Sequence, residues 1–120
     1  MFTFLCFLLY IINCYCRERV PLIIDTDIGG DFDDAVAVAY AVSRQDVFDI
    51  KLILTATYNT TGKAQLTAKY LQYMNASHID IGIGILTSSG GCGDQCPWAE
   101  GYQFSEYGPG NLHYIFSIIN

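Results

Sequence analysis

Apolar residues along the chain fall into short runs separated by polar, glycine-containing turns. Residues 20–25 (VPLIID) are apolar up to an abrupt polar turn, and they predict a buried strand. Residues 33–44 (DDAVAVAYAVSR) are rich in alanine, open with two acids that suit a helix amino terminus, and are apolar on all sides. That composition predicts a buried helix.

The next part of the chain repeats the order of strand and then helix. Residues 50–57 (IKLILTAT) are rich in β-forming residues and predict a second strand. Thr60 or Thr61 is suited to cap a following helix over residues 63–74. Residues 79–86 (IDIGIGIL) alternate along the chain and predict a third strand.

The last third of the chain is less regular. Residues 87–110 contain Gly, Ser and Pro, and a loop of this length is unusual inside a compact domain unless it has a function. Residues 111–119 (NLHYIFSII) are apolar again and predict the start of a helix.

This β-α-β-α-β order, followed by a long loop and a helix, predicts the α/β class. Strands that alternate with helices of this length form a parallel sheet with right-handed crossovers, the start of a doubly wound, Rossmann-like fold. Ligands bind such folds at the carboxyl ends of the strands. A sheet of three strands leaves an edge and apolar helix faces uncovered, which predicts poor solubility or self-association.

Composition narrows the class of partner. The chain has 120 residues, 52% of them hydrophobic, which suits one domain with an ample core. Its net charge of −6 opposes nucleic acid or an anionic membrane surface as partner, because both require clustered Lys and Arg. A small or neutral ligand fits better.

The amino-terminal segment predicts export. Residues 2–12 (FTFLCFLLYII) have the length of a signal-peptide hydrophobic region and fall short of the roughly 20 residues that a membrane span needs. Cys14 and Cys16 are small enough for a cleavage site, so residues 1–16 are interpreted as a signal peptide and residues 17–120 as the secreted domain. The alternative is a buried strand or helix in a cytoplasmic protein.

Cysteine spacing then predicts one covalent link. In an oxidising compartment Cys92 and Cys96, within the sequence GGCGDQC, are expected to close a small disulfide loop. A zinc site is less favoured, because one C-x-x-x-C pair lacks the other two ligands of a tetrahedral site.

The segment that carries the chemistry is the acidic turn at residues 25–34 (DTDIGGDFDD), which places five carboxylates between a buried strand and a helix. Two like charges about 4 Å apart repel by about 4 kcal/mol at an effective dielectric near 20, so such crowding needs raised pKa values or a cation. Oxygen-only ligands favour calcium or magnesium. The alternative is that Asp33 and Asp34 serve the helix dipole while Asp27 and Asp31 are solvated loop residues.

Two hydrolase families share features of this turn. A strand ending in D-x-D is similar to the motif of haloacid-dehalogenase phosphohydrolases, in which the first Asp is a nucleophile. That family has Thr or Val where this chain has Gly29, and it lacks the added Asp-Asp pair. The longer segment PLIIDTDIGGDFDDAVAVAYA resembles the amino-terminal signature of inosine/uridine-preferring nucleoside hydrolases, in its longer D-x-D-I-G-x-D-x-D-D form. Residues 53–72 and 79–85 resemble the same family's next strand, helix and third strand.

The resemblance implies hydrolysis of the N-glycosidic bond of ribonucleosides, with Ca²⁺ as cofactor and ribose and a free base as products. It implies that Asp27 is both a calcium ligand and the general base, and that Asp34 is a calcium ligand. It further implies that Asp33 holds ribose hydroxyls, that Asn59 approaches the ribose and that Asp25 supports the loop from behind.

The resemblance also implies that part of the site lies elsewhere. In that family a further calcium-ligating Asp, a neighbouring His and a Thr carbonyl lie downstream of the positions that this sequence covers. Asp27 and Asp34 supply three or four of the roughly six to eight oxygens that calcium takes. His78 and His113 are expected to be core or surface residues. The alternative function is therefore a non-catalytic remnant or a secreted binding protein.

Overall fold

The computed structural model describes residues 18–86, 90–108 and 112–114. The segment interpreted as a signal peptide, residues 1–16, lies outside these ranges. Within them, none of the helices has the length and apolar character that a membrane crossing requires.

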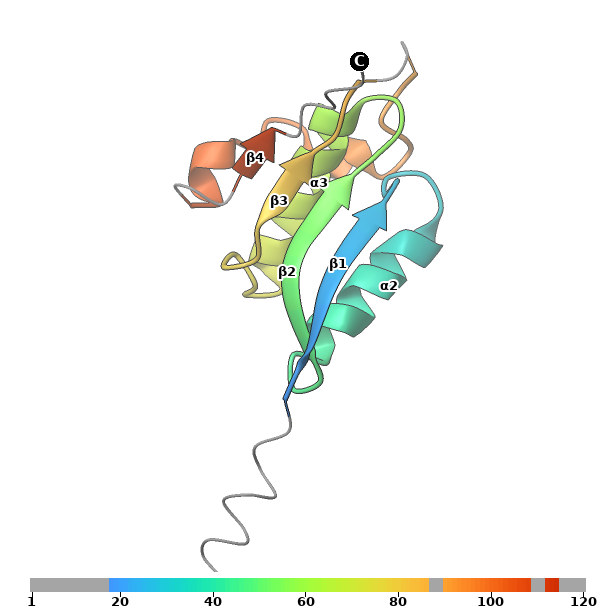
Figure 1. Cartoon of the computed structure of the whole chain (residues 1–120). Coiled ribbons are helices and arrows are strands. Elements are labelled where there is room, and N and C mark those ends of the chain that lie inside the picture. Colours follow the sequence, from blue (N-terminus) through green and yellow to red (C-terminus); the bar gives the residue numbers. More distant parts are fainter. Residues whose placement is uncertain (1–17, 87–89, 109–111, 115–120) are drawn as a thin grey trace, which may run out of the picture.

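The core of the fold is one sheet of parallel strands in the order β1-β2-β3-β4 (Figure 1). The four strands are β1 (Val20–Thr26), β2 (Phe48–Thr55), β3 (Ile81–Ile83) and β4 (Leu112–Tyr114). Because consecutive strands are neighbours and all run the same way, their carboxyl ends meet at one edge of the sheet. The predicted α/β class with a parallel sheet is confirmed.

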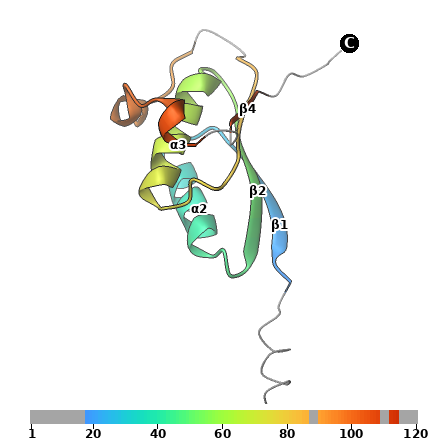
Figure 2. The same cartoon turned by 90° about the vertical axis from the view of Figure 1, so that its left-hand side faces the viewer.

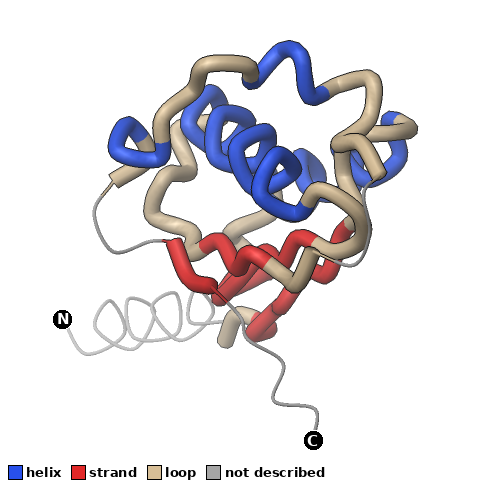
Figure 3. The backbone as a smooth tube through the Cα atoms, turned by 90° about the horizontal axis from the view of Figure 1, so that it is seen from above, coloured by secondary structure: helices blue, strands red, loops and turns tan. Residues whose placement is uncertain are grey.

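Both long helices lie on the same face of this sheet (Figures 2 and 3). Helix α2 (Phe32–Ser43) connects β1 to β2, and α3 (Thr60–Tyr73) connects β2 to β3. Two right-handed crossovers that advance in the same direction place their helices on one side. In the part of the chain that the structure describes, the other face carries no helix.

The core lies between the helices and the covered face. Alternate strand residues and one stripe of each helix supply it, as the two periodicities require. Its buried apolar members include Val38, Ile53, Ala64, Ala68, Leu71, Ile81 and Ile83. Because Thr26 and Thr55 follow Ile24 and Ile53 on the same strand face, the core reaches the carboxyl edge of the sheet.

A bulge interrupts the pairing of β1 with β2. Leu22 pairs with Ile50, but Ile23 pairs with Leu52, so Lys51 is an extra residue in β2. Beyond the bulge Ile53 faces the helices, and Leu54 faces the uncovered side.

The helix predicted over residues 111–119 is wrong where the structure describes it. Leu112–Tyr114 forms β4, which pairs in parallel with β3. The run is rich in β-branched and aromatic residues, and a short apolar run does not by its periodicity distinguish a strand from a helix. The free edge of β3 then decides in favour of a strand.

The long loop before β4 packs against α3 (Figure 1). It contains two short 3₁₀ turns, η1 (Cys96–Ala99) and η2 (Phe104–Glu106). The hydroxyl of the buried Tyr107 donates to the carbonyl of Ile79, which ties the loop to the residues before β3. Burial raises the pKa of this phenol well above its usual range.

Candidate functional site

The candidate site lies at the carboxyl edge of the sheet, where β1 and β2 end side by side. The amide of Ala56 donates to the carbonyl of Thr26 at 2.9 Å, so the two strands remain joined up to that edge. The buried Thr26 hydroxyl accepts from the amide of Ile28 at 3.1 Å. This hydrogen bond starts the turn that carries the acidic residues away from β1.

Asp27 and Asp34 are brought together at this turn. Asp34 lies in the first turn of α2, and its carboxyl group is close enough to the side chains of Asp27 and Thr26 for both to change its pKa. Burial raises the pKa of Asp34, and the hydrogen bond and charge of Asp27 raise it further, whereas the Thr26 bond lowers it. A carboxyl group whose ionised form is disfavoured beside a second acid has the electrostatic character of an oxygen-ligand cation site.

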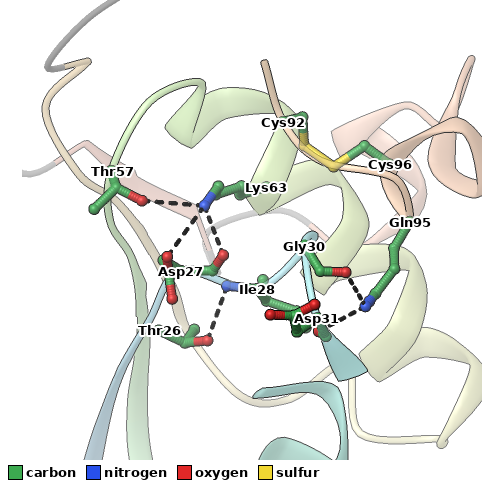
Figure 4. A network of polar contacts seen from close by, with 10 residues as sticks. All are labelled: Thr26, Asp27, Ile28, Gly30, Asp31, Thr57, Lys63, Cys92, Gln95 and Cys96. Atoms are coloured by element: carbon green, nitrogen blue, oxygen red, sulfur yellow. Dashed lines mark hydrogen bonds and ion pairs between the residues drawn. A yellow bond between two sulfur atoms is a disulfide. The ribbon is translucent and has the colours of Figure 1, made fainter. Parts of the chain in front are cut away.

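A buried lysine also reaches this site, and the sequence analysis did not identify it. Lys63 is only 3% exposed. Its ammonium donates to the main-chain carbonyl of Asp27 at 2.6 Å and to the hydroxyl of Thr57 at 3.1 Å (Figure 4). It also lies 4.0 Å from the Asp27 carboxylate. The signal was present in the sequence, because Lys63 shares the sheet-facing stripe of α3 with Thr60 and Thr67, where an unpaired lysine is not tolerated.

The backbone after β2 is strained where it meets this lysine. Thr57 has φ 60° and Tyr58 has φ 51°, a left-handed conformation that costs of order 1–3 kcal/mol for non-glycine residues. The conformation places the Thr57 hydroxyl against the Lys63 ammonium. Surrounding structure must therefore hold the turn in place.

The disulfide loop packs directly on the acidic turn (Figure 4). The structure joins Cys92 and Cys96, whose Cα atoms are 5.9 Å apart. Between them, Gln95 donates its main-chain amide to the carbonyl of Gly29 at 2.9 Å. Its side-chain amide donates to the carbonyls of Gly30 at 2.8 Å and Asp31 at 2.7 Å. One glutamine thus fixes three consecutive carbonyls of a loop that lies over sixty positions earlier in the chain.

Glycines allow the two loops to approach this closely. A Cβ atom on Gly93 would lie 2.1 Å from the carbonyl oxygen of Gly29, and one on Gly29 would lie 2.5 Å from that of Cys92. Both glycines also have positive φ, at +113° and +123°. A side chain at either position would separate the loops.

Two separate cavities flank the disulfide loop. The first, about 320 Å³, is lined by Asp27, Tyr58 and Lys63 together with glycines of both loops. The second, about 350 Å³, is lined by Asn59 and not by Asp27. Asn59 uses its side-chain oxygen to cap α3, accepting from the amide of Gly62 at 2.9 Å. The structure therefore does not bring Asn59 into the cavity of Asp27, and its observed role is that of a helix cap.

The other two predicted site acids lie differently from Asp27. Asp33 is exposed on the first turn of α2, and its charge helps to raise the pKa of Asp34. Asp25 is exposed on the uncovered face of β1, because it alternates with the inward-facing Ile24 and Thr26. Among the described residues no hydrogen bond or ion pair joins Asp25 to the acidic turn. The expectation that Asp25 supports the loop from behind stays a prediction, and in the structure Thr26 contacts the acidic turn.

Neither histidine reaches the site. His78 lies near the amino end of β3 with its Nε2 atom 2.9 Å from the side-chain oxygen of Gln45. His113 lies on β4, with its Nε2 atom 3.3 Å from the carboxylate of Asp80. Both are surface residues, as predicted.

The donor atoms present fit a hard cation in part. Asp27 and Asp34 provide adjacent carboxylate oxygens, which suit calcium or magnesium. Within residues 18–86, 90–108 and 112–114, no group of three or more His, Cys, Asp or Glu side chains converges in a way that could hold a metal ion. No protein-family model, curated protein or solved structure matches this chain.

Proposed function

We propose that the chain binds a calcium ion through Asp27 and Asp34 and takes part in hydrolysing the N-glycosidic bond of ribonucleosides. The observation that supports this most directly is that these two carboxyl groups lie beside each other at the carboxyl edge of a parallel sheet, where burial and then Asp27 raise the pKa of Asp34. Ligand sites in open α/β sheets lie at that edge. The resemblance of the acidic turn to nucleoside hydrolases supplies the reaction.

The residues have distinct roles in this proposal. Calcium held there would supply Lewis acidity that lowers the pKa of a water molecule. Asp27, whose side chain is 63% exposed and lines the cavity, accepts the proton of the attacking water as general base. Fixed carboxylates nearby stabilise the positive charge that develops on the sugar ring as the bond to the base breaks. Asp33 would hold ribose hydroxyls from the first turn of α2.

The electrostatics of the acid pair also favour a cation. In the metal-free site the ionised form of Asp34 is disfavoured by burial and by Asp27. A divalent ion removes that penalty, so binding of calcium is coupled to deprotonation of Asp34. Asp27 and Asp34 supply three or four of the roughly six to eight oxygens that calcium takes, and water or other protein groups complete the set.

Calorimetric titration of the whole chain with calcium tests the cation site. We expect wild type to bind calcium, and Asp27→Asn and Asp34→Asn each to weaken binding at least about tenfold, because a carboxylate ligand is lost. Asp46→Asn is the matched control, since it removes the same charge from the opposite edge of the sheet. Equal binding by all four proteins would refute the site.

Release of base from inosine or uridine, followed by absorbance, tests the reaction. We expect release that needs calcium, stops with a chelator and is absent in Asp27→Asn. Calcium binding without any release would leave the second candidate, a non-catalytic binding protein. One observation favours that candidate, namely that Asn59 lines a different cavity from Asp27.

The phosphohydrolase alternative has less support. It requires Asp25 as nucleophile, and Asp25 does not line the cavity of Asp27 but lies exposed on the uncovered face of the sheet.

A further inference from the structure

Lys63 places a fixed positive charge beside the carboxylate that the proposed function assigns to calcium. Its ammonium lies 4.0 Å from the Asp27 carboxylate and donates to the Asp27 carbonyl and the Thr57 hydroxyl. The residue is 3% exposed, so this charge is screened far less by water than a surface lysine. The chain has therefore already enclosed a cation at this edge of the sheet.

The contacts of the ammonium favour the role of a counter-ion over the other usual roles of a buried lysine. A nucleophilic or substrate-binding lysine needs a free N–H or a free lone pair directed into a cavity. Here two of the three ammonium N–H groups donate to the Asp27 carbonyl and the Thr57 hydroxyl, and the Asp27 carboxylate lies 4.0 Å away. Its position is that of an internal counter-ion.

The strained turn after β2 is an independent sign that this counter-ion is built into the site. Thr57 and Tyr58 both adopt positive φ, and the Thr57 hydroxyl is thereby placed on the ammonium. The ring of Tyr58 lies 5.9 Å from the same ammonium. Two residues thus pay a conformational cost in the segment that surrounds Lys63.

We infer that Lys63 is a tethered cation that balances Asp27 in the metal-free chain and sets a low affinity for calcium. This inference rests on the proposed function, because it concerns the same carboxylate. An ion bound to Asp27 shares that carboxylate with the ammonium, and two cations on one carboxylate repel each other. Lys63 is in this sense a positioning residue, since it acts on the ion through Asp27.

The test is calcium affinity, measured by calorimetry and by the shift of the thermal midpoint, in Lys63→Met and Lys63→Gln. Gln retains a donor for the Asp27 carbonyl without the charge, and Met retains only the length. Lys51→Met is the matched control. It changes the net charge equally, but Lys51 is an exposed residue in an ion pair with Asp49. We expect both Lys63 variants to bind calcium at least about tenfold more tightly than wild type, and Lys51→Met to differ less than about twofold.

The outcomes separate the two ideas. Wild-type calcium binding that is unchanged in both Lys63 variants would overturn the inference and leave the proposed function intact. Absence of binding in wild type and in both variants would overturn both. A Lys63 variant that is unfolded without calcium but folds when calcium is added would support the inference. If both variants stayed unfolded at every calcium concentration, the inference would be overturned, because the ammonium would then be needed only for folding.

Discussion

The acids at the two edges of the sheet have opposite environments. At the amino edge Asp46 pairs with Arg44 at 2.9 Å, and Asp49 pairs with Lys51 at 2.6 Å, and these basic partners lower the pKa of both carboxyls. At the carboxyl edge Asp34 faces Asp27, and burial with a like charge raises its pKa.

This difference distinguishes acids that are paired with basic residues from acids that are placed beside one another. Asp46 is exposed and Asp49 is half-buried, and each has its shortest ion pair with a basic residue two positions away, so these surface pairs contribute little to stability. The carboxyl-edge acids are held by contacts across long stretches of chain, from Lys63 and from the disulfide loop. A ligand that relieves such an unfavourable arrangement of charge binds more favourably because of it.

The largest effect is expected where the two loops of the carboxyl edge touch. Gly93→Ala forces a Cβ atom against the Gly29 carbonyl and adds the strain of positive φ, so we expect a loss of about 2–5 kcal/mol in the free energy of unfolding. Gly101→Ala also has positive φ, at +77°, but meets open space, and should lose about 1–2 kcal/mol. Urea unfolding measures both, and equal losses would show that the loop contact contributes nothing.

A smaller effect is expected for Asp→Asn substitutions at pH 7, which should change the stability of the fold in opposite directions at the two edges. In metal-free protein at pH 7, Asp34→Asn removes a disfavoured charge and should stabilise the fold by about 0.5 kcal/mol. Because the folded pKa of Asp34 is raised, the wild-type penalty disappears as the pH falls through that pKa towards the ordinary value. The stabilisation by Asn should disappear with it.

Asp46→Asn should behave in the opposite way. The folded pKa of Asp46 is lowered by Arg44, so its contribution to stability is present above the ordinary carboxyl pKa and is lost as the pH falls through the folded value. We therefore expect slight destabilisation at pH 7 that disappears in acid. Thermal unfolding between pH 2 and pH 7 in the presence of a chelator measures both variants, and changes of the same sign would contradict the comparison.

The smallest effect concerns salt at the amino edge. Lys51→Met breaks an exposed pair, so it should shift the thermal midpoint slightly in dilute buffer and not at all near 1 M NaCl, where the Debye length is about 3 Å. A shift that persists in high salt would indicate that the pair contributes through packing as well as charge.

Most of the fold could be predicted from periodicity, because strands and helices of the first two-thirds of the chain show their burial in the spacing of apolar residues. The position of Asp25 follows from the same rule. It shares strand parity with the exposed Ile23, so the uncovered face was its expected position.

Other features depend on tertiary contacts that local spacing does not encode. The three bonds of Gln95 to the acidic turn join residues more than sixty positions apart, and no pattern in either segment specifies the pairing. Strand β4 depends on the edge that β3 offers. For Lys63, the position on the buried stripe of α3 follows from helical periodicity, but the identity of its partner does not.

The extra residue Lys51 changes which residues of β2 face the helices. Before it, the even-numbered residues of β2 face the helices. After it, the odd-numbered residues Ile53 and Thr55 do. Deleting a residue after the bulge, such as Leu54, would force the end of β2 either to lose the register of Thr55 with Thr26 or to turn Ile53 outward. Deleting Lys51 itself would instead leave a regular ladder with Thr55 still opposite Thr26, so the proposed cation site would tolerate a missing residue at the bulge and not beyond it.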